Sequence, residues 1–92
     1  MNQYESVIII NASLEEAKIK AVIEKFSTLI GENGKVEKVE EVGSKKLAYE
    51  INKQKEGYYV VIHFEAKPAF IAELERIYRI TDEVIKFIVV KK

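Results

Sequence analysis

Two hydrophobic periods alternate along this chain, and their order restricts the folds that it can adopt. Some runs are apolar and rich in β-branched residues, as strands are. They span residues 4–10, 35–51, 58–65 and 84–90. Apolar residues at steps of three and four, after Ser13 and again after Pro68, predict two amphipathic helices. The predicted order is therefore strand, helix, strand, strand, helix, strand.

Connected in this order, the elements form a sandwich of known topology. Right-handed crossovers place the first and third strands in the middle of a four-stranded antiparallel sheet, with both helices on one face. This is the ferredoxin-like β-α-β-β-α-β fold of the α+β class, and residues 1–92 suffice for a single domain with one core. We expect the core to include Ile8, Ile10, Val22, Phe26, Leu74 and Ile77. The fold by itself names no function, because many unrelated activities use it.

The ends of the predicted helices carry characteristic residues. Ser13 with Glu16 three residues later forms a capping-box pattern, in which each side chain bonds a free backbone N–H group. We expect Gly31 or Gly34 to end the first helix, since glycine adopts the left-handed conformation that many helix C-termini need. Pro68 suits the first turn of the second helix.

The apolar run at residues 35–51 is the least regular of the predicted strands. Gly43 interrupts its pattern and predicts a bulge or a bend. After this point, the side chains expected to hold the strand on the core are Leu47, Tyr49 and Ile51. Residues 52–57 are polar and predict the loop of a hairpin.

Residue types that carry catalysis or bind metals are scarce. The chain has no cysteine, and His63 is its single histidine. On a central strand, we expect His63 to be a structural or solvent-facing residue rather than a catalyst. A nucleophile with its base, or a set of metal ligands, cannot be assembled from these residue types. We therefore expect no enzymatic activity, no cofactor and no bound metal.

The sequence offers no signal for export or for insertion into a membrane. The N-terminal residues lack the features of a signal peptide, and no apolar run approaches the ~18 residues of a membrane span. The lack of cysteine fits a reducing compartment. We expect a cytoplasmic protein with no membrane partner.

Charges balance over the whole chain but are unevenly distributed. Lysine and arginine number 15, as do aspartate and glutamate, so the formal net charge is zero. A basic cluster lies in residues 35–55 and consists of Lys35, Lys38, Lys45, Lys46, Lys53 and Lys55. These lysines either protect an exposed edge strand from aggregation or neutralise RNA phosphates. Tyr49, Tyr58 and Tyr59 likewise either pack across the sheet or stack on single-stranded RNA.

One stretch is more specific than these general patterns. Gly-Ser-Lys-Lys-Leu-Ala-Tyr-Glu-Ile at residues 43–51, followed by Gly-Tyr-Tyr at residues 57–59, closely resembles the signature region of bacterial small-subunit ribosomal protein six. The flanks agree, since Tyr4 and Glu5 open the first strand as in that family and residues 79–91 resemble its last helix and strand. The resemblance covers nearly the whole chain. A departure lies at residues 2–3, Asn-Gln, where the family commonly has an arginine.

The resemblance implies a structural component of the small ribosomal subunit. That family pairs with small-subunit ribosomal protein eighteen, and the pair binds the central domain of the small-subunit ribosomal RNA without cofactor or catalysis. The candidate RNA-binding residues are Lys45, Lys46, Lys53, Lys55, Arg79 and Lys86. The resemblance aligns Lys45 and Lys46 with the family's basic pair, and Arg79 and Lys86 with places where the family has arginine. Lys53 and Lys55 complete the basic hairpin.

A second hypothesis for the function uses the same fold. The chain could be a ferredoxin-like regulatory module that dimerises through its open sheet face or edge and binds a small ligand. That class usually has a glycine-rich turn between the first strand and the first helix. Residues 11–13, Asn-Ala-Ser, contain no glycine, which favours the ribosomal hypothesis.

Overall fold

The chain forms the predicted elements in the predicted order. The computed structural model describes residues 1–51 and 54–92. The elements in these residues are β1 (Asn2–Asn11), α1 (Glu16–Asn33), β2 (Gly34–Ile51), β3 (Gln54–Ala66), α2 (Pro68–Ile80) and β4 (Val84–Lys91). Each strand is somewhat longer than its hydrophobic run, because backbone pairing continues past the last apolar side chain. Neither helix is both long enough and apolar enough to cross a bilayer.

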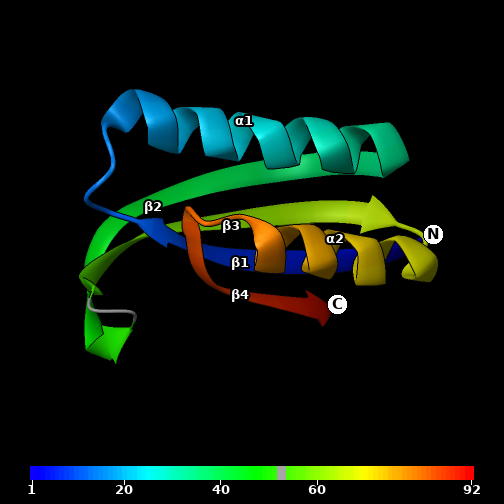
Figure 1. Cartoon of the computed structure of the whole chain (residues 1–92). Coiled ribbons are helices and arrows are strands. Elements are labelled where there is room, and N and C mark those ends of the chain that lie inside the picture. The colour runs from blue at the N-terminus through cyan, green and yellow to red at the C-terminus, as the bar shows by residue number, and fades with distance from the viewer. Residues whose placement is uncertain (52–53) are drawn as a thin grey trace.

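The four described strands make one antiparallel sheet in the order β2-β3-β1-β4. The first and third strands are therefore central, as predicted. Both helices lie on the same face of this sheet, and the opposite face carries no helix of the described chain (Figure 1). The predicted ferredoxin-like α+β sandwich is confirmed.

The core lies between the sheet and the two helices. Ile8, Ile10, Phe26 and Leu74 are fully buried and Val22 nearly so, as predicted. The prediction was wrong for Ile77, which is only partly buried and packs against the rim of the core. The buried residues of α2 are Phe70, Leu74 and Tyr78, as the pattern of that helix predicted, while Ile77 lines the cavity between the helices.

The predicted capping box at the start of α1 is wrong. The helix begins at Glu16 with Glu15 as its N-cap, and the Glu15 side chain makes no capping hydrogen bond. The Ser13 hydroxyl donates to Asn11 Oδ1 at 2.6 Å, and the Ser13 backbone N–H donates to the same oxygen at 2.9 Å. The nearby asparagine carbonyl therefore binds Ser13 in the turn before the helix begins.

Helix α1 ends just before Gly34, which was one of the two glycines predicted to end it. The reason for a glycine at this position is not the predicted left-handed conformation. Its φ of −177° is extended and not left-handed. Gly34 pairs with Ala66 at the start of β2, and a Cβ atom there would overlap the backbone carbonyl oxygen of Glu65. Close contact between two backbones therefore requires the glycine.

The hairpin of β2 and β3 is longer than the sequence predicted. Residues 54–57 belong to β3 rather than to a loop, whereas Asn52 and Lys53 lie outside the described residues. The expectation that Tyr49 faces the core is wrong, because this side chain is 66% exposed. Pairing of β2 with β3 continues past Gly57, the last β3 residue that pairs with β1, and Tyr49 lies in this extension of β2, away from the core.

The predicted bulge at Gly43 is confirmed. The register between β2 and β3 shifts between Glu41 and Gly43, and Gly43 has a φ of 102°, in the left-handed region. With alanine at position 43, the backbone would have to keep a φ angle that L-residues rarely adopt, because the Cβ atom makes it sterically unfavourable.

We expect Gly43→Ala to destabilise the protein by about 1–2 kcal/mol. The matched control is Gly31→Ala, since Gly31 lies in α1 and a Cβ atom added to it would meet open space. This change should instead stabilise the protein by about 0.5–1 kcal/mol, because alanine favours a helix. Denaturant unfolding of both variants measures the difference, and equal effects would contradict the role assigned to Gly43.

Candidate nucleic-acid interface

The β2–β3 hairpin extends past the rest of the sheet and forms the hairpin arm, residues 46–51 and 54–56 (Figure 1). Its base is marked by the pairing of Asn11 with Gly57, beyond which β3 has no partner in β1. Lys45, Lys46 and Lys55 are exposed at the base and along the arm. Lys53 lies outside the described residues, so its predicted position in the arm is untested. The arm thus presents lysine side chains to solvent.

Arg79 and Lys86 come together where α2 ends and β4 begins. Both line a cavity of about 360 Å³ together with Phe87 and neighbouring residues. The Arg79 guanidinium lies 5.9 Å from the centroid of the Phe87 ring, a distance suitable for a cation–π contact. Both cationic side chains are exposed. The structure therefore joins two residues that only the family resemblance had singled out.

These two groups of cations lie at the same end of the sheet. The strand register aligns Lys86, Ile9, Tyr59 and Gly43 across the four strands. Two residues further along β2 and β3, Lys45 pairs with Gly57. Directly paired residues, and residues two apart on one strand, project to the same face of a sheet. Partly exposed Tyr59 therefore has Lys45 as a diagonal neighbour on β2, and Ile9 of β1 separates it from Lys86 on β4. With strands ~4.8 Å apart, the two edges are roughly 14 Å from each other.

The described candidate residues are available for an anion. Within residues 1–51 and 54–92, none of their side chains forms an ion pair. These described candidates are Lys45, Lys46, Lys55, Arg79 and Lys86. Unpaired, exposed lysine and arginine side chains are the groups that proteins use to contact phosphate.

A second feature occupies the open face, the sheet surface that the helices leave uncovered. One row across it is Val90, Glu5, His63 and Lys38, and the next is Ile88, Val7, Val61 and Glu40. Ile88 and Val90 are 50% and 45% exposed. The apolar side chains of this face therefore form a patch that contains a small group of charges.

His63 lies at the centre of those charges. Its Nε2 is 3.9 Å from Glu5 Oε1 and 3.8 Å from Glu40 Oε2, while Lys92 Nζ lies 2.6 Å from Nδ1. The hydrogen bond from Lys38 and its positive charge lower the pKa of Glu40. Sequence reasoning missed this group. One signal in the sequence could have indicated it. Glu5 and His63 alternate with residues that are buried, so both lie on the sheet face away from the helices.

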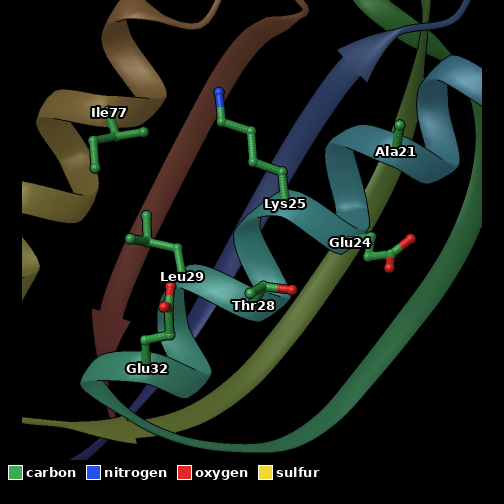
Figure 2. A pocket seen from close by; sticks show the side chains of 7 residues that line it. All are labelled: Ala21, Glu24, Lys25, Thr28, Leu29, Glu32 and Ile77. Atoms are coloured by element: carbon green, nitrogen blue, oxygen red, sulfur yellow. The ribbon is translucent and has the colours of Figure 1, made fainter.

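A different cavity, of about 540 Å³, lies between the helices on the other side of the sheet (Figure 2). Leu29 and Ile77 give it an apolar floor, and Glu24, Lys25 and Glu32 stand around it. None of the described candidate RNA-binding residues lines this cavity. Within the described chain, no three histidine, cysteine or acidic side chains are arranged to hold a metal ion.

Comparison with known proteins gives consistent matches over nearly the full length of the chain. A family model described as ribosomal protein S6 matches residues 3–91. Small ribosomal subunit protein bS6 from Clostridium novyi is 54% identical over 91 residues, which cover 98% of this chain and 96% of that protein. The protein of the same name from Heliobacterium modesticaldum is 41% identical, covering 100% of this chain and 97% of that protein.

A solved structure agrees with these relatives. The crystal structure of 30S ribosomal protein S6 from Thermotoga maritima matches with a TM-score of 0.94 at 38% sequence identity. The match covers 99% of this chain and 87% of that chain. Fold and sequence together place the chain among the ribosomal proteins. More narrowly, it belongs to the ribosomal protein S6 family, which confirms the resemblance found at residues 43–51 and 57–59.

Proposed function

We propose that this chain is a structural component of the small ribosomal subunit in the cytoplasm. It binds the central domain of the small-subunit ribosomal RNA together with small-subunit ribosomal protein eighteen, and it needs no cofactor. The observation that carries the RNA-binding part is the placement of exposed lysines on both sides of Tyr59 at one end of the sheet. The names of the relatives, all bS6 proteins of the small subunit, support the assignment to that particle.

The zero net charge of the chain supports RNA binding together with a second protein rather than by the chain alone. Each phosphate that a lysine or arginine neutralises releases counterions, and this release supplies much of the affinity for nucleic acid. A chain with 15 basic and 15 acidic residues can neutralise only the few phosphates that its local clusters reach. A basic partner bound beside it would provide the remaining positive charge.

The open face supports the existence of such a partner. Helices cover only the other side of the sheet, and Val7, Val61, Ile88 and Val90 form an apolar patch on this side. Contiguous apolar surface that stays exposed in a small domain is typical of a protein-binding site. This apolar patch lies next to the end of the sheet that carries the candidate RNA-binding lysines. The row that contains Lys86 and Tyr59 follows the row of Ile88, Val7 and Val61 on the same surface.

Replacing Lys45 and Lys46 together with alanine tests the RNA contact. We expect weaker binding of the two-protein complex to RNA, and a salt dependence reduced by roughly one to two units in the log–log slope. The fold should be unchanged because both side chains are exposed. The measurement is RNA affinity at several salt concentrations. An unchanged slope would assign these lysines to protection of the β2 edge instead.

The regulatory-module hypothesis is separated from this proposal by a capture experiment. The tagged chain, expressed in its own cells, should retain small-subunit ribosomal RNA and small-subunit ribosomal protein eighteen after washing at moderate salt. Capture of neither would favour the regulatory module. The turn after β1 contains Asn11, Ala12 and Ser13, and so it offers no glycine-rich loop for a small ligand.

A further inference from the structure

The Glu5 carboxylate on the open face lacks a strong countercharge. Within the described residues, its ion pair is with His63 alone, at 3.9 Å, and that pair is charged only when the histidine is protonated. Glu40, by contrast, has the Lys38 ammonium at 2.8 Å. The two neighbouring carboxylates therefore differ in how well their charges are matched.

A cation of the chain itself, Lys92, lies at the opposite nitrogen of the His63 ring from Glu5. Lys92 Nζ donates a hydrogen bond to His63 Nδ1, so the proton of a neutral His63 ring lies on Nε2, the nitrogen that lies near both carboxylates. The Lys92 backbone N–H donates to the Gln3 carbonyl oxygen at 2.9 Å. Since β1 lies between β3 and β4, the Lys92 side chain crosses β1 to reach His63.

A protein that covers the open face would make the charge of the Glu5 carboxylate less favourable. The side chain is 36% exposed and is flanked in its row by Val90 and His63, with Val7 two residues along β1. A partner that contacts the apolar side chains would remove water from the carboxylate. An ionised carboxylate without a paired cation is strongly unfavourable in such a setting.

We infer that the partner of the open face presents a lysine or arginine side chain that pairs with Glu5 beside His63. Apolar side chains next to that cation contact Val7, Val61, Ile88 and Val90. A cation from a protein fits at Glu5 by charge, because Lys38 already pairs with Glu40, whereas the RNA backbone would place phosphate against Glu5. This inference rests on the proposed assembly with small-subunit ribosomal protein eighteen and assigns a specific point of contact within it.

The test is the affinity of purified small-subunit ribosomal protein eighteen for three forms of the chain, measured by calorimetry without RNA. Glu5→Gln keeps the size of the side chain and removes its charge, and we expect it to weaken binding about tenfold or more and to reduce the salt dependence. The matched control is Glu24→Gln on α1, on the helical side of the sheet, which should bind within about twofold of the unaltered chain. Thermal unfolding of each variant verifies the fold.

The outcomes separate the inference from the proposed function. Equal binding by Glu5→Gln and the unaltered chain would overturn the contact at Glu5 and leave the assembly standing. Equal weakening by Glu5→Gln and Glu24→Gln would overturn it too, because net charge alone would then explain the effect. No binding by the unaltered chain would overturn both the assembly and the contact.

Discussion

Phe26→Ala is expected to destabilise the protein by about 3–5 kcal/mol, the range for removing a buried aromatic side chain. Phe26 is fully buried on α1, and its ring lies 4.6 Å from that of Tyr78 on α2 in an edge-to-face arrangement. The truncation removes apolar burial and leaves a cavity where the two helices meet the sheet. It also removes the aromatic contact between the helices. Equilibrium unfolding in denaturant measures this loss.

Two further variants test whether the loss arises from the core. Phe26→Leu, which keeps most of the apolar volume, should cost less than half as much as the alanine variant. Tyr49→Ala removes an aromatic side chain that is 66% exposed and should change stability by no more than about 0.5 kcal/mol. A loss below about 1 kcal/mol for Phe26→Ala would contradict the packing described for α1.

Tyr78→Phe is expected to destabilise the protein by about 1–3 kcal/mol, because it leaves a buried hydroxyl without a partner. The Tyr78 and Ser6 hydroxyls lie 2.9 Å apart, and both residues are fully buried. Ser6→Ala should carry a similar cost. The double variant should cost less than the sum of the single changes, since neither polar group then remains unpaired. Additive losses would show that the hydroxyls are not coupled.

The same tyrosine should make stability sensitive to alkaline pH. Burial raises the pKa of Tyr78 well above its ordinary value of 10.0. Above about pH 10 the unfolded chain ionises this tyrosine while the folded chain does not, so stability falls as the pH rises. Tyr78→Phe removes that contribution and should flatten the decline. An identical decline in the variant and the unaltered chain would contradict the role of Tyr78.

The sequence was sufficient for the order and type of the elements because each carries a clear hydrophobic period. It was less informative at ends set by local geometry. Ser13 matches a capping box, yet Asn11 is close enough to bind both its hydroxyl and its backbone N–H. At Gly34 the sequence predicted the position but not the cause, which is contact with a β3 backbone 31 residues away in sequence.

The candidate site could be predicted only as single residues. Lys45 and Lys46 were recognisable from their motif, whereas the cavity shared by Arg79 and Lys86 depends on the turn between α2 and β4. The contacts among Glu5, Glu40 and His63 depend on strand register across a bulged sheet, which a period-two pattern does not specify. Placement of Lys53 in the hairpin remains a prediction.

The central claim is that this zero-charge chain binds the central domain of the small-subunit ribosomal RNA jointly with a basic partner. The most direct measurement is the affinity for an RNA fragment of that domain at several salt concentrations. The chain is tested alone, small-subunit ribosomal protein eighteen alone, and both together. We expect weak binding with a shallow salt dependence for the chain alone, and tight, steeply salt-dependent binding for the pair. Tight, steeply salt-dependent binding by the lone chain, or affinity for the pair no greater than for its better member, would contradict the account.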